Sequence, residues 1–467
     1  MALASGRCDE GGNVRTKASL VELAAALCVA VLLTATSAGA SVMTTKTRTG
    51  NSVPLVAGGA TGKTGYLVYW DQNEEEDFVS MPSGAQGQLV PPWDPNGQMC
   101  LLPDGRFVVG YDPTLPAQDN LGSAKRYKQP PDGEELNEPN GSFSGQTLYV
   151  PGQFKIPGQA IGSDSPPTSK GVFNNNQTYT GCAVDRAGNV FGNDIATAQG
   201  QYPPPSSGRL VEWFAPSYTT ACIVYGPSSG GVGPHHTDGT GGLAQPGTMA
   251  LADNSDLLVP NVGSSSVLRF AHSSMPSNAS ECPGGIYPRD KVHVSAFAQG
   301  LSFPAGIAED PSCGCFAISS YIGNPGIEWV TKNGQPEPGR GSVPGTTIAN
   351  LGKDPNQYNP FGLAFAPNGT LYFVDIHVTC TGGLSGCGPA NYGGRVMRVT
   401  FTNGQPSVPV AIATGFDFPT SVTVCVPAKS VCPYPSGKIK APLSGPSENS
   451  APDAGPRTNT AGKAGFG

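Results

Sequence analysis

Short apolar segments recur along this chain, and each is joined to a second apolar segment by a tight polar turn. The best-formed example has apolar residues at 362–365, the turn residues Asn368 and Gly369, and a second apolar segment at 371–374. Asn-Gly and Asp-Gly tolerate the positive φ that a tight turn needs, so each unit predicts a β-hairpin. Six segments share this order of features, at 99–111, 181–194, 246–261, 303–319, 359–375 and 418–426.

Several units continue with a third segment in which apolar and polar residues alternate, as expected of a half-buried outer strand. These segments are 209–213, 266–270, 327–330 and 395–399. Several strands per repeat are typical of a β-propeller, whose usual period of roughly 40 to 50 residues is lengthened here by long loops. Two β-sandwiches are the alternative, but they do not usually repeat one strand–turn–strand phrase six times in register. The pattern therefore predicts an all-β fold, a six-bladed β-propeller with long inter-strand loops.

The segments outside the repeats set the predicted domain boundaries. The propeller is expected over 65–439, where the strand-like segment 65–70 completes the short last unit and removes exposed sheet edges. Residues 440–467 are rich in Pro, Ser, Ala and Gly and predict a disordered tail. Residues 41–64 are expected to be a flexible lead-in.

The N-terminus has the order of features of a signal peptide. Positive residues precede an apolar run at 20–33, and Ala38-Gly39-Ala40 offers small residues for cleavage after Ala40. The run is too short for a comfortable membrane span, which disfavours the alternative of an uncleaved anchor. We therefore predict a signal peptide at 1–40 and no transmembrane span in the mature chain. The location is predicted as secreted or extracytoplasmic, which includes the cell surface and the periplasm.

The cysteine count supports export. Removing Cys8 and Cys28 with the signal peptide leaves ten of the 12 cysteines, and an even number in an exported chain predicts disulfides. The closely spaced candidates are Cys313 and Cys315, Cys380 and Cys387, and Cys425 and Cys432. The last two pairs can each close a short loop, whereas the partners of Cys313 and Cys315 can lie elsewhere. A zinc site is the weaker alternative, because no two pairs share ribbon-like spacing.

Charge and sequons narrow the range of partners. The net charge is −7 and no basic patch stands out, which argues against nucleic acid as a partner. Four sequons predict a glycoprotein if the source organism glycosylates exported proteins. Their asparagines are Asn140, Asn176, Asn278 and Asn368.

The repeat phrases resemble those of NHL-repeat and senescence-marker/gluconolactonase-like six-bladed propellers. The resemblance rests on residues 359–365 with Asn368-Gly369 and 371–375, and on residues 303–308. It covers roughly 65–426 and implies the propeller fold more specifically than any function, because one fold hosts many functions. The superfamily includes metal-dependent lactonases and esterases, quinone-dependent sugar dehydrogenases, lyases and plain binding modules.

The family's site motifs are mostly unmatched here. No close match exists to the early glutamate of the calcium- or zinc-dependent lactonases. The amidating-lyase-like members place a histidine just after the proline that opens each blade, and this chain has Gly247, Ala305, Phe361 and Thr420 there. The five histidines also form no motif recognisable from the quinone-dependent dehydrogenases.

Three clusters could carry chemistry. His235, His236 and Asp238 are candidate ligands for zinc or another transition metal, although their Gly-rich flanks favour a solvated loop. Asp375 and His377 could form an acid/base pair or bind a cation at a strand end, although Asp is also common there for turn chemistry. The acidic run 71–77 lacks the Gly and Glu of a calcium loop and is expected to be a solvated face.

These observations leave three functional hypotheses, with catalytic residues unknown. The first is an extracellular binding or scaffold module whose loops at 112–178, 195–208 and 376–394 recognise a protein, glycan or small molecule. The second is a metal-dependent hydrolase of the lactonase/esterase type, with Ca²⁺ or Zn²⁺ held over the central channel. The third is a quinone-dependent sugar dehydrogenase.

Overall fold

The structure is a computed structural model that describes part of the chain. The described residues are 98–111, 133–137, 143–149, 154–156, 159–161, 179–194, 208–226, 242–285, 287–351, 353, 358–380, 387–390, 393–416 and 419–426, with short strands at 52–53, 67–71, 76–80, 85–88 and 439–440. The predicted signal peptide lies outside these residues. Within the described ranges, no helix is long and apolar enough to cross a membrane.

The described residues confirm the all-β prediction, since they form antiparallel sheets and only 3-10 helices. Six sheets have three or more strands, and we number them along the chain. The first contains β5 (Cys100–Leu101), β6 (Phe107–Tyr111), β7 (Gly133–Asn137) and β8 (Phe143–Tyr149). The second contains β11 (Tyr179–Val184), β12 (Val190–Asp194), β13 (Arg209–Trp213) and β14 (Ala221–Tyr225). The third contains β15 (Ala250–Leu251), β16 (Leu257–Asn261), β17 (Ser266–Phe270) and β18 (Val294–Gln299).

The last three sheets follow the same order of strands. The fourth contains β19 (Pro304–Asp310), β20 (Cys315–Ser320) and β21 (Ile327–Val330). The fifth contains β22 (Pro360–Phe365), β23 (Leu371–Asp375), β26 (Gly394–Val399) and β29 (Val410–Phe416). The sixth contains β30 (Ser421–Cys425), β2 (Leu67–Asp71), β3 (Glu76–Ser80) and β4 (Ala85–Gln88), with β31 (Ile439–Lys440) and β1 (Ser52–Val53) beyond β4.

Smaller elements decorate the sheets. Two-stranded ladders join β9 (Phe154–Ile156) to β10 (Gln159–Ile161), β24 (Val378–Cys380) to β25 (Cys387–Pro389), and β27 (Phe401–Thr402) to β28 (Gln405–Pro406). The 3-10 helices are η1 (Val262–Ser264), η2 (His272–Ser274), η3 (Ala279–Glu281), η4 (Pro283–Gly285), η5 (Arg289–Lys291) and η6 (Ile348–Asn350).

The sixth sheet joins the two ends of the described chain. β2 pairs antiparallel with β30, with Leu67 opposite Cys425 and Asp71 opposite Ser421. An N-terminal strand therefore completes the last unit, as the sequence predicted. β1 and β31 also pair with each other, so strand pairing extends into the predicted lead-in and to the first residue of the predicted tail.

One turn geometry recurs where the first strand of a sheet meets the second. In the fifth sheet, Ala366 N–H donates to Thr370 O and Gly369 N–H donates to Ala366 O, both at 2.9 Å. The same pair of bonds closes the turns at 102–106, 185–189 and 252–256. Gly105 and Gly369 adopt φ of 90° and 80°, which confirms the positive φ predicted for the Asp-Gly and Asn-Gly turns.

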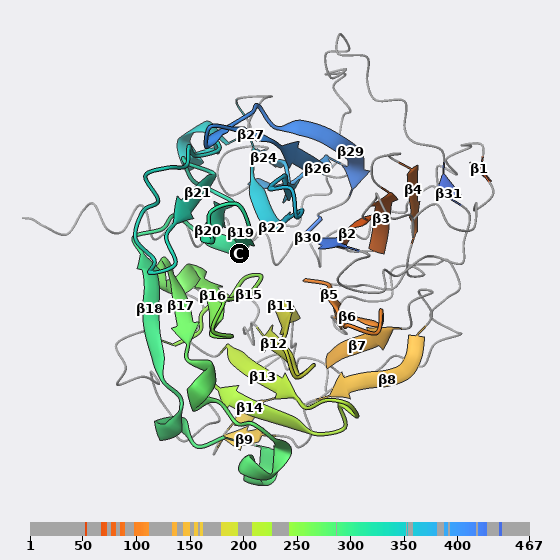
Figure 1. Cartoon of the computed structure of the whole chain (residues 1–467), viewed down its shortest axis with the longest axis vertical. Coiled ribbons are helices and arrows are strands. Elements are labelled where there is room, and N and C mark those ends of the chain that lie inside the picture. The colour runs from red at the N-terminus through yellow and green to blue at the C-terminus, as the bar shows by residue number, and fades with distance from the viewer. Residues whose placement is uncertain are drawn as a thin grey trace, which may run out of the picture.

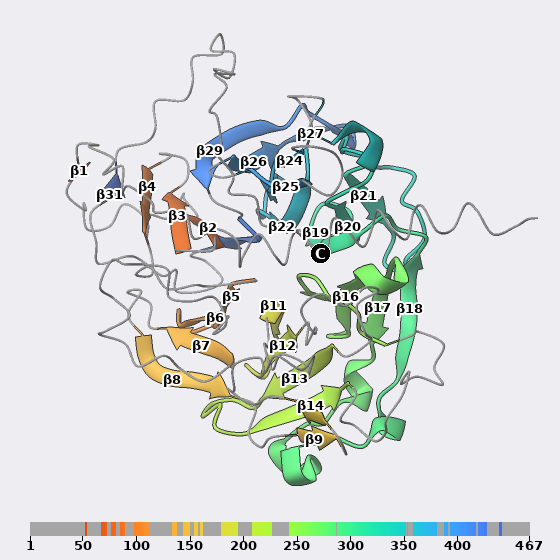
Figure 2. The ribbon, with the colours of Figure 1, turned by 180° about the vertical axis from the view of Figure 1, so that it is seen from behind.

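The six sheets lie around a common centre, with β5, β11, β15, β19, β22 and β30 nearest to it (Figure 1). The view from behind shows the same order around the ring (Figure 2). The first strand of each sheet contacts the first strand of the next from β5 to β30. The Thr423 hydroxyl of β30 then donates to the carbonyl of Met99 beside β5 at 2.7 Å, which connects the sixth sheet to the first.

Backbone carbonyls at the start of the inner strands join neighbouring sheets. They belong to Gly247, Ala305, Phe361 and Thr420, the positions just after the opening prolines. Their donors come from the preceding sheet: Asn193 Nδ2 at 2.7 Å, Thr248 N at 2.9 Å, the Ser319 hydroxyl, and Gly362 N at 3.1 Å, in that order. We call these four hydrogen bonds the junction bonds.

Two glycines at the junction bonds, Gly247 and Gly362, have no room for a side chain. A Cβ on Gly247 would lie 1.9 Å from the carbonyl oxygen of Ala305, and one on Gly362 would lie 2.7 Å from Ser421 Cα. Such contacts would force the sheets apart, because real Cβ atoms are essentially never found below 3.0 Å. Glycine at these positions therefore follows from close backbone approach rather than from turn geometry.

Apolar side chains fill the space between successive sheets. Leu257 and Val259 of β16 pack toward the second sheet, whereas Leu258 between them packs toward the fourth. Neighbouring sheets cover both faces of such a strand, so its sequence is continuously apolar rather than alternating. Disulfides reinforce two of the contacts, since Cys100–Cys182 joins the first and second sheets and Cys222–Cys282 joins β14 to the residue after η3.

The expectation of half-buried third strands was wrong for β13. All five of its residues are buried, including the charged residues Arg209 and Glu212. β13 is not an outer strand, because β14 pairs with its far edge and the first and third sheets cover its faces. In β13, the alternation of apolar and polar residues therefore did not indicate which side chains are exposed to solvent.

Burial changes the ionisation of Glu212. One carboxyl oxygen, Oε1, accepts from Asn189 Nδ2 at 3.1 Å, and the other has no hydrogen-bond partner in the described part of the chain. Desolvation, together with the negative charge of Asp185, raises the pKa of Glu212 from 4.5 to about 9. The side chain is therefore a neutral acid near pH 7.

Glu212 makes stability fall as the pH rises. Its pKa is higher in the folded state than in the unfolded chain, so the folded state binds more proton between about pH 4.5 and pH 9, and stability is lost across that window. We expect Glu212→Gln, which keeps a neutral side chain, to flatten that dependence. The difference in Tm between the variant and the parent should grow in favour of the variant from pH 5 to pH 9 in thermal unfolding. A constant difference would contradict the assignment.

Candidate functional site

The predicted residues Asp375 and His377 lie together at the end of β23, next to the start of β22. We call this end of the sheets, where the first strands start and the second strands end, the rim. Asp375 is fully buried. Its Oδ1 accepts from the backbone N–H of Asn359 at 2.9 Å and of His377 at 3.0 Å. Its Oδ2 accepts from Arg395 Nε at 2.9 Å and also from the terminal nitrogen of that guanidinium. Both carboxylate oxygens are therefore engaged inside the protein.

Asn359 extends this network to the neighbouring sheet. Its Nδ2 donates to the carbonyl of Tyr321 at 2.9 Å, and its Oδ1 accepts from Val378 N at 2.9 Å. The carboxylate, the amide and the guanidinium thus hold the segment after β23 against the fourth sheet.

His377 is half-buried and adopts a φ of 46°. Its Nδ1 lies 3.4 Å from the terminal guanidinium nitrogen of Arg395. Burial, and then the positive charge of Arg395, lower the pKa of His377, while Asp375 opposes them. The imidazole is therefore neutral at pH 7, the form that can accept a proton or bind a metal.

Other strand ends on this rim are also held internally. Asn193 donates to Gly247 O in a junction bond. Asn261 Oδ1 accepts from Ala244 N at 2.7 Å, and its Nδ2 donates to Gly242 O at 2.8 Å. Both asparagines are completely buried. These polar residues at or next to the ends of the second strands therefore tie backbone segments together.

The oxygens of Asp375 are already engaged by protein donors. A hard cation needs several free oxygen ligands, whereas the oxygens of Asp375 already accept four hydrogen bonds. The guanidinium of Arg395 also supplies the positive charge that a cation would bring. His235, His236 and Asp238 lie outside the described residues, so they stay predicted metal ligands.

Sequence reasoning missed Arg395 and Asn359. Arg395 lies directly opposite Asp375 in the ladder between β23 and β26, and Arg209 lies opposite Asp194 in the second sheet. An acid that ends one strand and an arginine that starts the next thus recur in two sheets. Comparison of the repeats over their third strands would have exposed that signal.

Two of the four predicted sequons are described. Asn278 and Asn368 are both exposed, and Asn278 Oδ1 accepts from Ser280 N at 3.0 Å as the cap of η3. Asn140 and Asn176 lie outside the described residues. Glycosylation itself stays a prediction.

The buried ion pair at the rim predicts a large stability effect. Asp375→Asn would leave the partly buried guanidinium of Arg395 without its counter-ion, and we expect a loss of about 3 kcal/mol in the free energy of unfolding. The matched control is Asp104→Asn, whose carboxylate is 52 % exposed and pairs with Arg106 in a surface turn; it should change stability by less than about 0.5 kcal/mol. Urea unfolding measures both, and equal effects would contradict a structural role for Asp375.

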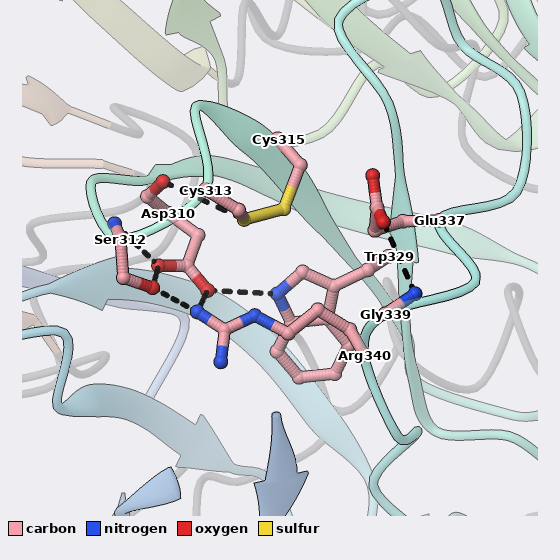
Figure 3. The surroundings of a disulfide bond; sticks show 8 residues. All are labelled: Asp310, Ser312, Cys313, Cys315, Trp329, Glu337, Gly339 and Arg340. Atoms are coloured by element: carbon pink, nitrogen blue, oxygen red, sulfur yellow. Dashed lines mark hydrogen bonds and ion pairs between the residues drawn. A yellow bond between two sulfur atoms is a disulfide. The ribbon is translucent and has the colours of Figure 1, made fainter. Parts of the chain in front are cut away.

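A second polar cluster lies at the opposite end of the sheets, around the turn between β19 and β20. Asp310 is fully buried, and Oδ2 accepts from Arg340 at 2.6 Å and from Trp329 Nε1 at 3.2 Å. Its Oδ1 accepts from Ser312 N at 3.0 Å. Figure 3 shows these side chains converging beside a disulfide.

That disulfide joins Cys313 to Cys315. The expectation that their partners can lie elsewhere was therefore wrong, because the tight turn places both sulfur atoms on the same side of the hairpin. Sulfur atoms of both residues and a carboxylate oxygen of Asp310 lie within 4.8 Å of one another. Among the described residues, this is the one group of three side chains of metal-ligating types that lie this close together. Its two sulfur atoms are bonded to each other.

The remaining predicted pairs are described in part. Cys380 and Cys425 are each disulfide-bonded. Cys380 faces Cys387 in the ladder between β24 and β25, the arrangement that a short loop closure would need. Cys432 lies outside the described residues. Disulfide bonding is thus confirmed as a feature of the chain.

The comparisons with known proteins find similar structures only. No family model matches the sequence, and no curated protein matches it. A putative gluconolactonase has a TM-score of 0.35 and 14% identity, over 68% of this chain and 90% of that one. A luciferin-regenerating enzyme has a TM-score of 0.38 and 14% identity, over 79% and 98%. Regucalcin from Agrobacterium tumefaciens, a calcium-binding protein, has a TM-score of 0.38 and 10% identity, over 66% and 77%.

These names are of the kind that the sequence resemblance suggested. They include a putative gluconolactonase and regucalcin, whereas no NHL-repeat protein is among the three. At such low TM-scores, the likeness carries no argument about what this chain binds or catalyses.

Proposed function

We propose that the six sheets are the blades of a six-bladed β-propeller in an exported protein. The support is the order of contacts around the ring and the pairing of β2 with β30, which joins an N-terminal strand to the last sheet. Propellers of this kind use such a strand to hold the ring closed and to protect sheet edges. The disulfides support export, because such bonds persist in oxidising compartments.

We propose that this propeller acts as an extracellular binding or scaffold module. The observation that carries the proposal is the internal hydrogen bonding of Asn193, Asn261 and Asp375 at the rim. Side chains held in this way stabilise the ring and leave recognition to the connections between strands. The ligand would be an extracellular protein, a glycan or a small molecule, met by the long connections at 112–178, 195–208 and 376–394.

A metal-dependent hydrolase of the lactonase/esterase type is the second candidate. The names of the compared structures fit this candidate better, whereas the hydrogen bonding of the rim fits the scaffold candidate better. The observation that favours it in this chain is the half-buried imidazole of His377, whose Nδ1 lies 3.4 Å from the guanidinium of Arg395 and whose pKa burial lowers. A neutral imidazole at a strand end is suited to accept a proton from water. The quinone-dependent dehydrogenase is the third candidate.

Three measurements on the purified mature protein separate the candidates. Elemental mass spectrometry after dialysis without chelator should find far less than one calcium or zinc per chain. In screens of lactones and esters, any hydrolysis by the parent protein should persist in the His377→Gln variant. Arrays of glycans and secreted proteins should show saturable binding. About one metal ion per chain, with hydrolysis lost in His377→Gln, would overturn the scaffold proposal in favour of the hydrolase.

A further inference from the structure

The Cys313–Cys315 disulfide contributes little to holding its hairpin together. The backbone N–H groups of Cys313 and Gly314 both donate to Asp310 O, at 3.2 and 2.9 Å. Asp310 also faces Cys315 in the ladder between β19 and β20. The turn is therefore already closed by hydrogen bonds. A disulfide between residues two apart also restricts the unfolded chain far less than bonds that close loops of 60 and 82 residues.

The three disulfides with both partners described differ in exposure. Cys313 is exposed at the tip of its hairpin. The four cysteines of the other two bonds are at most 7% exposed, so an attacking thiolate cannot approach their sulfur atoms while the protein is folded. Access is one of the factors that set the rate of thiol–disulfide exchange.

Charged groups stand beside the accessible bond. The Asp310 carboxylate lies within 4.8 Å of both sulfur atoms, and Arg340 donates to Asp310 and to the Ser312 hydroxyl (Figure 3). A carboxylate near a cysteine disfavours the thiolate, the form in which a sulfur leaves a disulfide, and the pairing of Arg340 with Asp310 offsets that negative charge. The ion pair also keeps the cluster close to neutral.

We propose that the Cys313–Cys315 disulfide is an exchangeable redox site that oxidises dithiols. A thiolate of the dithiol attacks the Cys313 sulfur, the bond between Cys313 and Cys315 breaks, and the Cys315 thiolate leaves and takes a proton. The second thiol of the dithiol then attacks the sulfur that the dithiol contributes to the mixed disulfide. The Cys313 thiolate leaves and is protonated. The dithiol loses two electrons and two protons, and the cysteine pair gains them.

The folded protein should survive this reaction. The junction bonds and the ladder between β19 and β20 involve no sulfur atom. In the disulfide form Cys313 Sγ lies 3.8 Å from Asp310 O, so a thiol formed there by reduction would have an acceptor close by. The reduced and oxidised forms are therefore expected to share one fold, as a site that cycles between them requires.

The test uses the native mature protein with EDTA present, so that freed thiolates do not bind metal. The protein is incubated with dithiothreitol as a small dithiol, and in parallel with a reduced peptide that carries two closely spaced cysteines. Free thiols are alkylated at intervals and located by peptide mass spectrometry, while near-UV circular dichroism follows the fold. The bonds Cys100–Cys182 and Cys222–Cys282 are internal controls.

We expect Cys313 and Cys315 to be alkylated at least about ten-fold faster than the control cysteines, with the circular dichroism unchanged. One disulfide should form in the peptide for each bond opened, and the Cys313→Ser/Cys315→Ser variant should form none. Reaction with dithiothreitol but not with the peptide would assign the site to small dithiols. Opening no faster than the controls, or only with loss of the folded signal, would overturn the proposal.

Discussion

The close approach of backbones at the start of the inner strands is the constraint on which the rest of the structure depends. At four successive junctions, a carbonyl just after an opening proline accepts a hydrogen bond from the preceding sheet. That geometry requires glycine at 247 and 362, where a Cβ would collide with backbone atoms of the next sheet. It also draws Asn193 and Ser319 into the ring, because their side chains supply donors where the backbone does not.

Close packing around a ring explains the electrostatics as well. Strands between two neighbouring sheets are covered on both faces, so charged residues on them are buried along with apolar ones. Asp375 is matched by Arg395, and Asp310 by Arg340. Among the described residues, no cation pairs with Glu212, and desolvation keeps this side chain neutral instead. The same packing that fixes the ring therefore also keeps Glu212 protonated.

Much of the fold was predictable because short local sequence patterns specify its hairpins. Asn-Gly and Asp-Gly turns between apolar segments identify the hairpins, and positive φ at Gly105 and Gly369 bears this out. The burial of Arg209 and Glu212 was not predictable, because alternation describes a strand and not the sheets that cover it. At the candidate site, Asp375 and His377 were identified by their place at a strand end. Arg395 was missed because its partner lies 20 residues away across a ladder. The pairing of Cys313 with Cys315 also depended on a turn whose shape the spacing alone does not state.

The junction bonds can be tested most directly by native-state hydrogen exchange at Thr248 and Gly362, whose N–H groups donate across two junctions. If the ring is closed as described, these two amides open only with global unfolding. They should then exchange as slowly as the amide of Phe373 in the middle of the fifth sheet, and far more slowly than the exposed turn amide of Gly339. Exchange of Thr248 and Gly362 at the rate of Gly339 would contradict the account, because the sheets would then not be held together at the centre.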